Sequence, residues 1–469
     1  MSKRPTRLLL TAATALLLAG ATTTAQASAA VRPHQPAPTT RTAGATQPRD
    51  WQERTVTVAA SPAPGPRSTD YLSVLKVGPT NAKKVLVLIP GRGEAAGGFR
   101  QDAEYLARTV PGLQVWAVDR REQTLADLSG FAGTAQQAQA YYLGGHNKVP
   151  AASSDSYVAD WGLATELDDV RTVVLQAQDH GRRQVVLGGH SLGATAVLDY
   201  AAWDFDGTPG YRDLAGLVVI DGGVLNALSG AGLDFSLDEA QAASWRDQIA
   251  AGQVFDNATS QYTGFGDQPQ SAAIWYQLAA KWALQDPHGA SALQDLVPAS
   301  FRPDQPVTNA GLLGWMLDQH APLPGYSVHS GHLSATGDWI DDGPTPISRV
   351  AEGFASSDPA AWEQYSPNRL ALDYYASAAF TDNSVAREQG LRLFHTKDID
   401  IPLYVFQSDL AEGTVGDAAR TVAADSRIPS VDVESDFSMS HLDILFATPS
   451  KNTFLKTVTP FLTGLSERH

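Results

Sequence analysis

The chain contains no cysteine, which excludes disulfide bonds, thiolate catalysis and cysteine-ligated zinc. Basic residues are also scarce: 34 Lys and Arg stand against 50 Asp and Glu, a formal net charge of −16. Such an acidic protein repels the phosphates of nucleic acids and anionic lipids, so we expect no nucleic-acid partner. Hydrophobic residues make up 43% of the 469 residues, which is typical of a globular protein with a large core.

The sequence has no apolar run suited to a membrane span. Its longest, Leu8 to Ala21, is short and rich in alanine. Basic residues precede this run, and small residues follow it in an A-x-A spacing at Ala25, Ala27 and Ala29. We therefore expect residues 1–29 to be a secretory signal peptide, and the protein to be secreted without integral membrane association. Residues 30–50, rich in Pro, Thr, Ala and Gln, are expected to form a disordered linker.

Strand and helix patterns alternate along much of the remaining chain. The expected strands are Trp51–Ala60, Tyr71–Val77, Lys84–Ile89, Leu113–Val118, Gln184–Leu187, Ala215–Ile220, Ile401–Phe406 and Val431–Glu434. Helical periodicity lies between several of them, as at Ala159–Gln178. Repeated β-α-β units predict an α/β fold with a mostly parallel central sheet of about eight strands and flanking helices.

The alternation stops after Asp221, where helical, aromatic-rich segments begin. This change predicts a core made of residues 51–222 and 399–469, interrupted by a helical cap at residues 223–398. Aromatic and Met side chains of the cap could line an apolar acyl site or form the cap's own core. The candidates are Trp275, Tyr276, Trp282, Trp315 and Met316.

A candidate nucleophile lies in the sequence Gly189-His190-Ser191-Leu192-Gly193. An apolar strand precedes it and a helix of small residues follows it, which is the setting that a G-x-S-x-G elbow requires. The sharp turn lifts the serine hydroxyl above the sheet, and the helix N-terminus favours negative charge nearby. We therefore expect Ser191 to be a catalytic nucleophile.

Four motifs together resemble those of α/β-hydrolases over most of residues 51–467: GHSLGA at the elbow, LVLIPGRG, VWAVDRR, and a late histidine in SHLDIL. The resemblance implies a triad in the chain order serine, acid, histidine. It assigns the base to His441. For the acid it favours Asp409, which follows the strand IPLYVFQS, over the alternative Asp221, which follows LAGLVVI.

An oxyanion hole needs two backbone N–H donors. The resemblance assigns one to Leu192, next after the nucleophile, and the other to Arg92 in the loop Pro90-Gly91-Arg92-Gly93. The Arg92 side chain could face the substrate or simply be solvated. Asp119, Arg120 and Arg121 close the fourth strand and are interpreted as structural charges.

These features predict a secreted serine hydrolase that cleaves small or lipid-like carboxylic esters through an acyl-enzyme, without cofactor or metal. An amidase, peptidase or acyltransferase could use the same triad. A non-catalytic binding protein on a hydrolase scaffold is the alternative from a different class.

Overall fold

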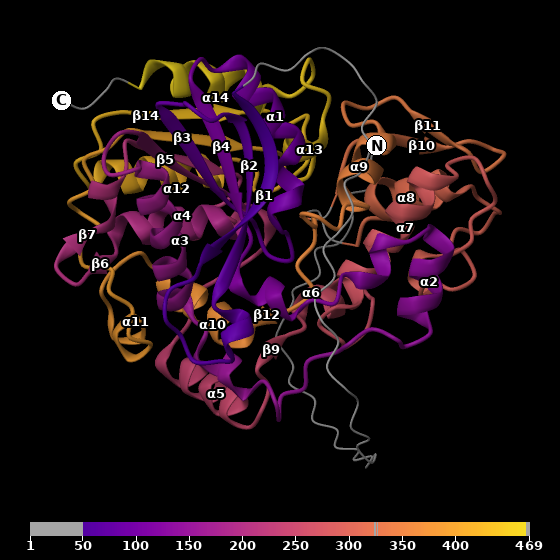
Figure 1. The fold of residues 1–469 in the computed structure, drawn as a ribbon, viewed down its shortest axis with the longest axis horizontal. Helices are drawn as coiled ribbons and strands as arrows, with labels where there is room; N and C mark the ends of the chain where they lie inside the picture. The colour runs from indigo at the N-terminus through magenta and orange to yellow at the C-terminus, as the bar shows by residue number, and fades with distance from the viewer. Residues whose placement is uncertain (1–49, 323–324, 326, 466–469) are drawn as a thin grey trace, which may run out of the picture. The chain divides into compact units, whose positions relative to one another are not determined.

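A computed structural model describes residues 50–322, 325 and 327–465. The expected signal peptide, and the expected linker up to residue 49, lie outside the described residues. One sheet of eight strands forms the centre of the fold (Figure 1). Its strands are β1 (Trp51–Ala59), β2 (Tyr71–Pro79), β3 (Lys84–Ile89), β4 (Leu113–Val118), β5 (Gln184–His190), β8 (Gly216–Ile220), β13 (Leu403–Gln407) and β14 (Val431–Ser435). The eight expected strands are thus all present, and the predicted α/β class is confirmed.

The strands are arranged in the order β1-β2-β4-β3-β5-β8-β13-β14. β1 and β2 pair antiparallel, as do β2 and β4, while the strands from β4 to β14 run parallel. The C-terminal ends of β3, β5, β8 and β13 therefore meet at one edge of the sheet. In open α/β sheets this edge is where functional side chains gather.

Helices cover both faces of the sheet. They are α1 (Arg100–Thr109) and α14 (Thr453–Gly464) on one face, and α3 (Leu163–Gln178), α4 (Leu192–Ala202) and α12 (Thr414–Ala424) on the other. Alternate residues of β3 contribute to the two sides: Leu86 and Leu88 pack with the first group, Val85 and Val87 with the second. Burial on both faces explains why these strands read as continuous apolar runs.

A long insertion separates β8 from β13. Its elements are α5 (Glu239–Ala250), β9 (Phe255–Asp256), α6 (Ala258–Tyr262), α7 (Ser271–Gln285), α8 (Asn309–Gly314), a π-helix (Trp315–Gln319), β10 (Gly331–Leu333), β11 (Trp339–Asp341), α9 (Ile347–Phe354), β12 (Ser366–Pro367), α10 (Asn368–Ser377) and α11 (Ser384–Glu388). The segment expected to be a helical cap, residues 223–398, thus contains helices joined by long irregular stretches, together with four short strands.

The insertion packs in two places. Its first and last parts, including α5 and α10, join the side of the sheet covered by α3 and α4. Its middle part, α7 to α9 with the β10–β11 hairpin, gathers beside the sheet (Figure 1). There α7 packs against α2 (Ala135–Leu143), which comes from the segment between β4 and α3. The cap candidates Tyr276, Trp282 and Met316 are buried in the core of this middle part.

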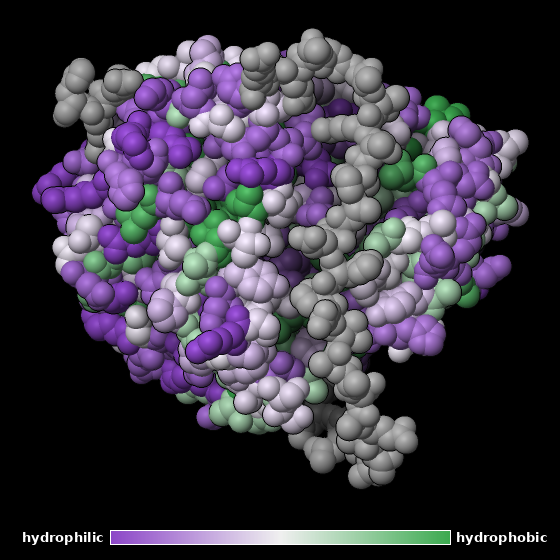
Figure 2. Space-filling view, in the orientation of Figure 1, coloured by the Kyte–Doolittle hydropathy of each residue, from purple (hydrophilic) through white to green (hydrophobic). Residues whose placement is uncertain are grey.

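Figure 2 shows a face that is mostly hydrophilic, with hydrophobic side chains in small separate groups. Within the described part of the chain, no helix is long and apolar enough to cross a membrane.

Several carboxyl groups are buried in the core, and Asp199 on the elbow helix α4 is the clearest. Its side chain is fully buried and accepts a hydrogen bond from Ser377 Oγ at 2.7 Å. Burial raises the pKa of Asp199 to about 7, although the Ser377 hydrogen bond opposes the shift. The folded state therefore holds this proton more tightly than the unfolded chain, so the contribution of Asp199 to stability is greatest at acid pH and falls as the pH rises toward about 7.

We predict that Asp199→Asn makes the free energy of unfolding less dependent on pH. Between pH 5 and 7.5 the stability of wild-type protein should change, relative to that of the variant, by a loss on the order of 1–3 kcal/mol. Urea unfolding at several pH values measures the difference. Asp417→Asn, at a carboxylate whose side chain is 79% exposed, is the control. Equal pH slopes for Asp199→Asn and wild type would contradict the prediction.

Candidate active site

Ser191 occupies a sharp turn between β5 and α4. Its backbone angles, φ 56° and ψ −121°, are unfavourable for a residue with a side chain. The Ser191 amide donates to Ile220 O at 2.8 Å, which ties the turn to the end of β8. This strand–turn–helix geometry is that of a nucleophile elbow.

The two glycines of the motif are required by close packing. A Cβ atom at Gly189 would lie 2.2 Å from Gly193 O, and one at Gly193 would lie 2.2 Å from Ile89 O. Such distances are far below van der Waals contact. The turn can therefore form only because both positions lack a side chain.

His441 is held by Asp221, which follows β8 directly. The distance from His441 Nδ1 to Asp221 Oδ2 is 2.6 Å, and both side chains are buried. Because a carboxylate only accepts hydrogen bonds, Nδ1 carries a proton and Nε2 of the neutral ring is left to accept one. The Asp221 carboxylate also accepts hydrogen bonds from Ser408 Oγ and, at 2.8 Å, from Ser408 N. Burial alone would raise the pKa of Asp221, but the hydrogen bonds from His441 and Ser408 outweigh it and lower this pKa.

The structure corrects the expected acid. The resemblance favours Asp409, but the Asp409 carboxylate is 43% exposed and lies 3.9 Å from His329 Nε2 rather than beside His441. The reason is that Ser408 and Asp409 follow β13, one strand farther along the sheet, and the Asp409 amide is bonded to Met439 O at 3.0 Å. The alternative, Asp221, occupies the position next to the imidazole.

The nucleophile and the His441–Asp221 pair are brought together. A Cβ atom at Gly222, next to Asp221, would lie 2.1 Å from Ser191 O. The His190 ring, next to Ser191 in the chain, contacts the His441 ring with centroids 4.2 Å apart and planes tilted by 32°. His441 thus contacts the residue before Ser191, and its partner Asp221 precedes a residue that packs against Ser191.

The residues of the two expected oxyanion donors, Leu192 and Arg92, both lie in segments that adjoin Ser191. Leu192 is the first residue of α4, where amides have no partner within the helix. The loop of Arg92 passes over the serine, since a Cβ atom at Gly91 would lie 2.8 Å from Ser191 Cβ. The Arg92 side chain is paired with Asp256 Oδ2 at 2.6 Å, so its charge is already balanced by the insertion. The role of the two amides stays a prediction.

Sequence comparisons found no family model and no curated protein that matches this chain. Among solved structures, a presumed lipase from Sulfolobus solfataricus superposes with a TM-score of 0.54, covering 89% of this chain and 95% of that one at 17% identity. The chain has the α/β-hydrolase fold. Two other structures are more distant. An esterase from Thermogutta terrifontis has a TM-score of 0.41 at 13% identity, covering 88% of this chain and 100% of that one. Epoxide hydrolase A from Mycobacterium thermoresistibile has a TM-score of 0.43 at 15% identity, covering 89% of this chain and 100% of that one.

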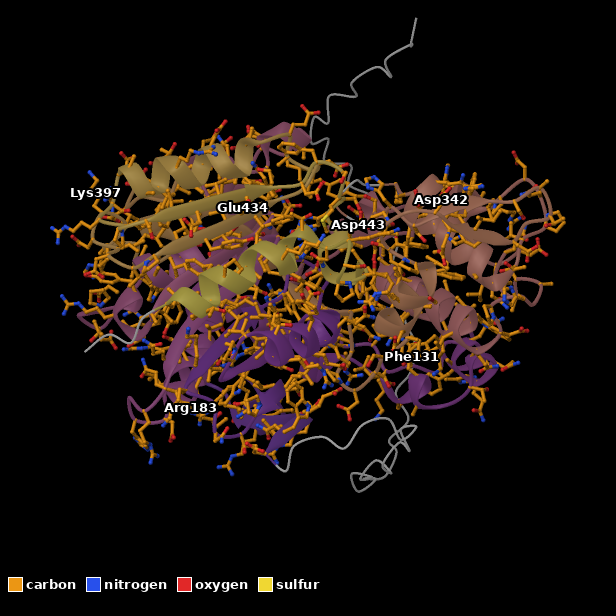
Figure 3. All side chains as sticks on the ribbon, turned by 90° about the horizontal axis from the view of Figure 1, so that it is seen from above. Phe131, Arg183, Asp342, Lys397, Glu434 and Asp443 are labelled. Atoms are coloured by element: carbon orange, nitrogen blue, oxygen red, sulfur yellow. The ribbon has the colours of Figure 1, made fainter. Side chains whose placement is uncertain are left out.

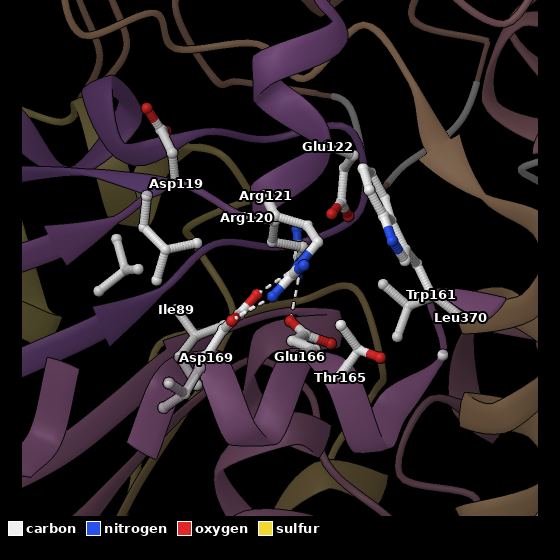
Figure 4. Close-up of a pocket in the computed structure, with 14 residues that line it drawn as sticks. Ile89, Asp119, Arg120, Arg121, Glu122, Trp161, Thr165, Glu166, Asp169 and Leu370 are labelled. Carbon is white, nitrogen blue, oxygen red and sulfur yellow. Dashed lines mark hydrogen bonds and ion pairs between the residues drawn. The ribbon is translucent and has the colours of Figure 1, made fainter. Parts of the chain in front are cut away.

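Within this α/β-hydrolase fold, Arg120 supports residues 90–94, the loop that carries the candidate oxyanion donor Arg92. Its guanidinium donates to Gly91 O at 3.0 Å and to Pro90 O, and it is paired with Glu166 at 2.7 Å and Glu363 at 3.0 Å. Figure 4 shows Arg120 directed toward Glu166, beside the pair formed by Arg121 and Asp169. These buried arginines agree with the structural role expected from the sequence.

Asp443 fastens the loop of His441 to the insertion. It is fully buried and accepts hydrogen bonds from Ser440 N at 2.8 Å, His329 N at 2.9 Å and Thr345 Oγ1 at 2.5 Å. Figure 3 places Asp443 where the C-terminal part of the chain meets the insertion. The Asp443 side chain also raises the pKa of His329 to about 9. The insertion therefore anchors the segment that carries the catalytic histidine candidate.

Sequence reasoning missed the pair formed by Glu94 and His190. Glu94 lies in the loop of the candidate oxyanion donor Arg92, and its two carboxylate oxygens are 2.9 and 3.0 Å from His190 Nδ1. Together with His441 they are the one group in the described residues whose donor atoms lie close enough to hold a metal ion. Both ring nitrogens of His190 face acceptors, however, and His441 Nδ1 faces Asp221. This donor set is occupied by internal hydrogen bonds, so it does not fit a metal; the expected independence from metals stays a prediction.

The corrected acid gives a direct prediction. Asp221→Asn should lower kcat for ester hydrolysis about 10⁴-fold with the fold intact, because asparagine cannot hold the imidazole in the required tautomer. Asp409→Asn should stay within a few-fold of wild type. Steady-state kinetics with circular dichroism of both variants measures this. A large loss of kcat in Asp409→Asn, with an active Asp221→Asn, would show that Asp409 is the acid.

Proposed function

We propose that this protein is a serine hydrolase that cleaves carboxylic esters through an acyl-enzyme. The observation that carries the proposal is the buried His441–Asp221 pair, 2.6 Å from Nδ1 to Oδ2, beside a serine on a nucleophile elbow. A serine hydroxyl becomes an effective nucleophile when a neighbouring imidazole takes its proton. Asp221 keeps that imidazole oriented and stabilises the imidazolium that results.

In the first half of the reaction, Ser191 Oγ attacks the ester carbonyl carbon while His441 Nε2 takes the hydroxyl proton. The carbonyl oxygen becomes an oxyanion, for which the amides of Leu192 and Arg92 are the proposed donors. The intermediate collapses with cleavage of the bond to the alkoxy group, and His441 returns the proton to the departing alcohol. Water then repeats the sequence on the acyl-enzyme, which releases the acid and restores Ser191.

The nucleophile also argues for acyl substrates over epoxides. Attack of a serine alkoxide on an epoxide would produce an ether, which water cannot hydrolyse through this machinery. Attack on an acyl group produces an ester, which the same triad can hydrolyse. Amidase, peptidase and acyltransferase activities share this chemistry and are alternative outcomes of a substrate screen.

The proposal is tested with a fluorophosphonate probe and a series of 4-nitrophenyl esters of graded chain length, with matched amides alongside. We expect the probe to label wild-type protein at Ser191, and the esters to be hydrolysed faster than the amides. Ser191→Ala should lose labelling and about 10⁶-fold in kcat. Folded wild-type protein that neither labels nor hydrolyses any of these compounds would favour the binding-protein alternative instead.

We further propose that the protein is exported through its N-terminal segment. The basic residues, the apolar run Leu8 to Ala21 and the A-x-A spacing that follows support this. Expression of the full chain in a secreting bacterial host should release protein into the medium, with an N-terminus near residue 30. Replacing Leu8–Ala21 by a polar sequence should keep the protein inside the cell. Intact, full-length protein in the cytosol of the first culture would contradict the proposal.

A further inference from the structure

His190, the residue before the nucleophile, lies in a fully buried position between two acceptors. Its Nδ1 is 2.9 and 3.0 Å from the two carboxylate oxygens of Glu94, and its Nε2 is 3.2 Å from the carbonyl oxygen of His441. A carboxylate and a backbone carbonyl can only accept hydrogen bonds. Both ring nitrogens of His190 must then carry protons, so the ring is an imidazolium paired with the Glu94 carboxylate.

This pair joins three segments of the site. Glu94 Oε2 accepts a hydrogen bond from Gly91 N at 2.8 Å, which fixes the loop that carries Arg92. His190 belongs to the elbow, and its other nitrogen holds the backbone of His441. The oxyanion loop, the nucleophile turn and the histidine loop are thus connected through two side chains that contact one another.

We propose that Glu94 and His190 are positioning residues: a buried carboxylate–imidazolium pair that aligns the oxyanion loop and His441 with Ser191. The proposal rests on the proposed hydrolase function for its kinetic consequences. The two residues hold backbone atoms of the catalytic segments, so their loss should disturb the transition state more than substrate binding. Misplacement of catalytic groups by about 1 Å can cost about 10²-fold in rate.

The electrostatic surroundings agree with a charged pair. Burial alone would lower the pKa of His190, but the Glu94 carboxylate outweighs it and raises that pKa. The other charged or titratable groups that face His190 are Asp221 and His441. Burial likewise opposes ionisation of Glu94, and His190 is the main cause that lowers its pKa below the usual value.

Glu94→Gln is the informative variant, because glutamine keeps the size of the side chain and removes its charge. His190 then faces a neutral amide instead of a carboxylate. It loses the two negatively charged oxygens that stabilise the protonated ring. We expect kcat to fall about 10- to 100-fold, with KM within about threefold of wild type. Glu94→Asp, which keeps the charge on a shorter side chain, should recover part of the loss.

Asp204→Asn is the matched control. Asp204 accepts from a second histidine, His395, at 3.0 Å, but lies beyond the far end of α4 from Ser191. The eleven residues of α4 span roughly 16 Å, so this pair cannot touch the site. Its loss should leave kcat and KM unchanged.

Nuclear magnetic resonance of ¹⁵N-histidine-labelled wild-type protein tests the charge state without any activity. His190, assigned by comparison with His190→Gln, should show two protonated ring nitrogens at neutral pH, and one protonated nitrogen in Glu94→Gln. A neutral His190 in wild-type protein overturns the proposal, as does a Glu94→Gln enzyme with the kcat of Asp204→Asn. If wild-type protein instead fails to react with the fluorophosphonate, the proposed function fails, while the imidazolium signature still decides whether the pair exists.

Discussion

Backbone contact around Ser191 is the constraint on which the site depends. The residue is held in an unfavourable conformation because its amide is bonded to the end of β8, 2.8 Å from Ile220 O. Three glycines let neighbouring chain segments come within contact of the turn: Gly193 against β3, Gly222 against Ser191 itself, and Gly91 above it. Any side chain at these positions would push the neighbouring segments away from the Ser191 turn.

The sheet order explains why these segments meet. β3, β5, β8 and β13 are adjacent and parallel, so the loops that follow them emerge side by side at one edge. This much could be predicted from the sequence, because strands buried on both faces leave continuous apolar runs. The placement of Ser191 on a sharp turn and of His441 near it could be expected as well, since each lies in a local motif whose position along the chain is informative; their catalytic roles stay predictions.

The acid could not be chosen from the sequence, because Asp221 and Asp409 both follow an apolar strand. What separates them is the direction of a turn: Asp221 has a left-handed backbone, φ 49°, and accepts the amide of Ser408 from the neighbouring strand end. Such a contact joins residues far apart in the chain. Glu94 was missed for a similar reason, since a lone acidic residue in a loop looks solvated until its buried histidine partner is seen.

Helix α2 could not be predicted from the sequence for a different reason. Thr134 and Gln137 form a capping box at its start, which is a readable signal, but the helix itself is rich in Ala and Gln and has little amphipathic pattern. Its stability comes from packing against α7 in the insertion, including a hydrogen bond from Trp282 Nε1 to Gln139 Oε1 at 2.9 Å. Contacts of this kind are tertiary, so no local pattern records them.

The insertion is also part of the support for the oxyanion loop, and Arg120 shows why. Its guanidinium reaches two loop carbonyls, Glu166 of α3 and Glu363 of the insertion at once, and both carboxylates are buried. The planar fork of arginine can serve these partners together, whereas the single ammonium of lysine could not span them. A buried guanidinium needs that full set, because an uncompensated buried charge is strongly destabilising. The insertion therefore helps to hold the loop in place by completing the set of partners around Arg120, which makes it a structural element of the site as well as its neighbour.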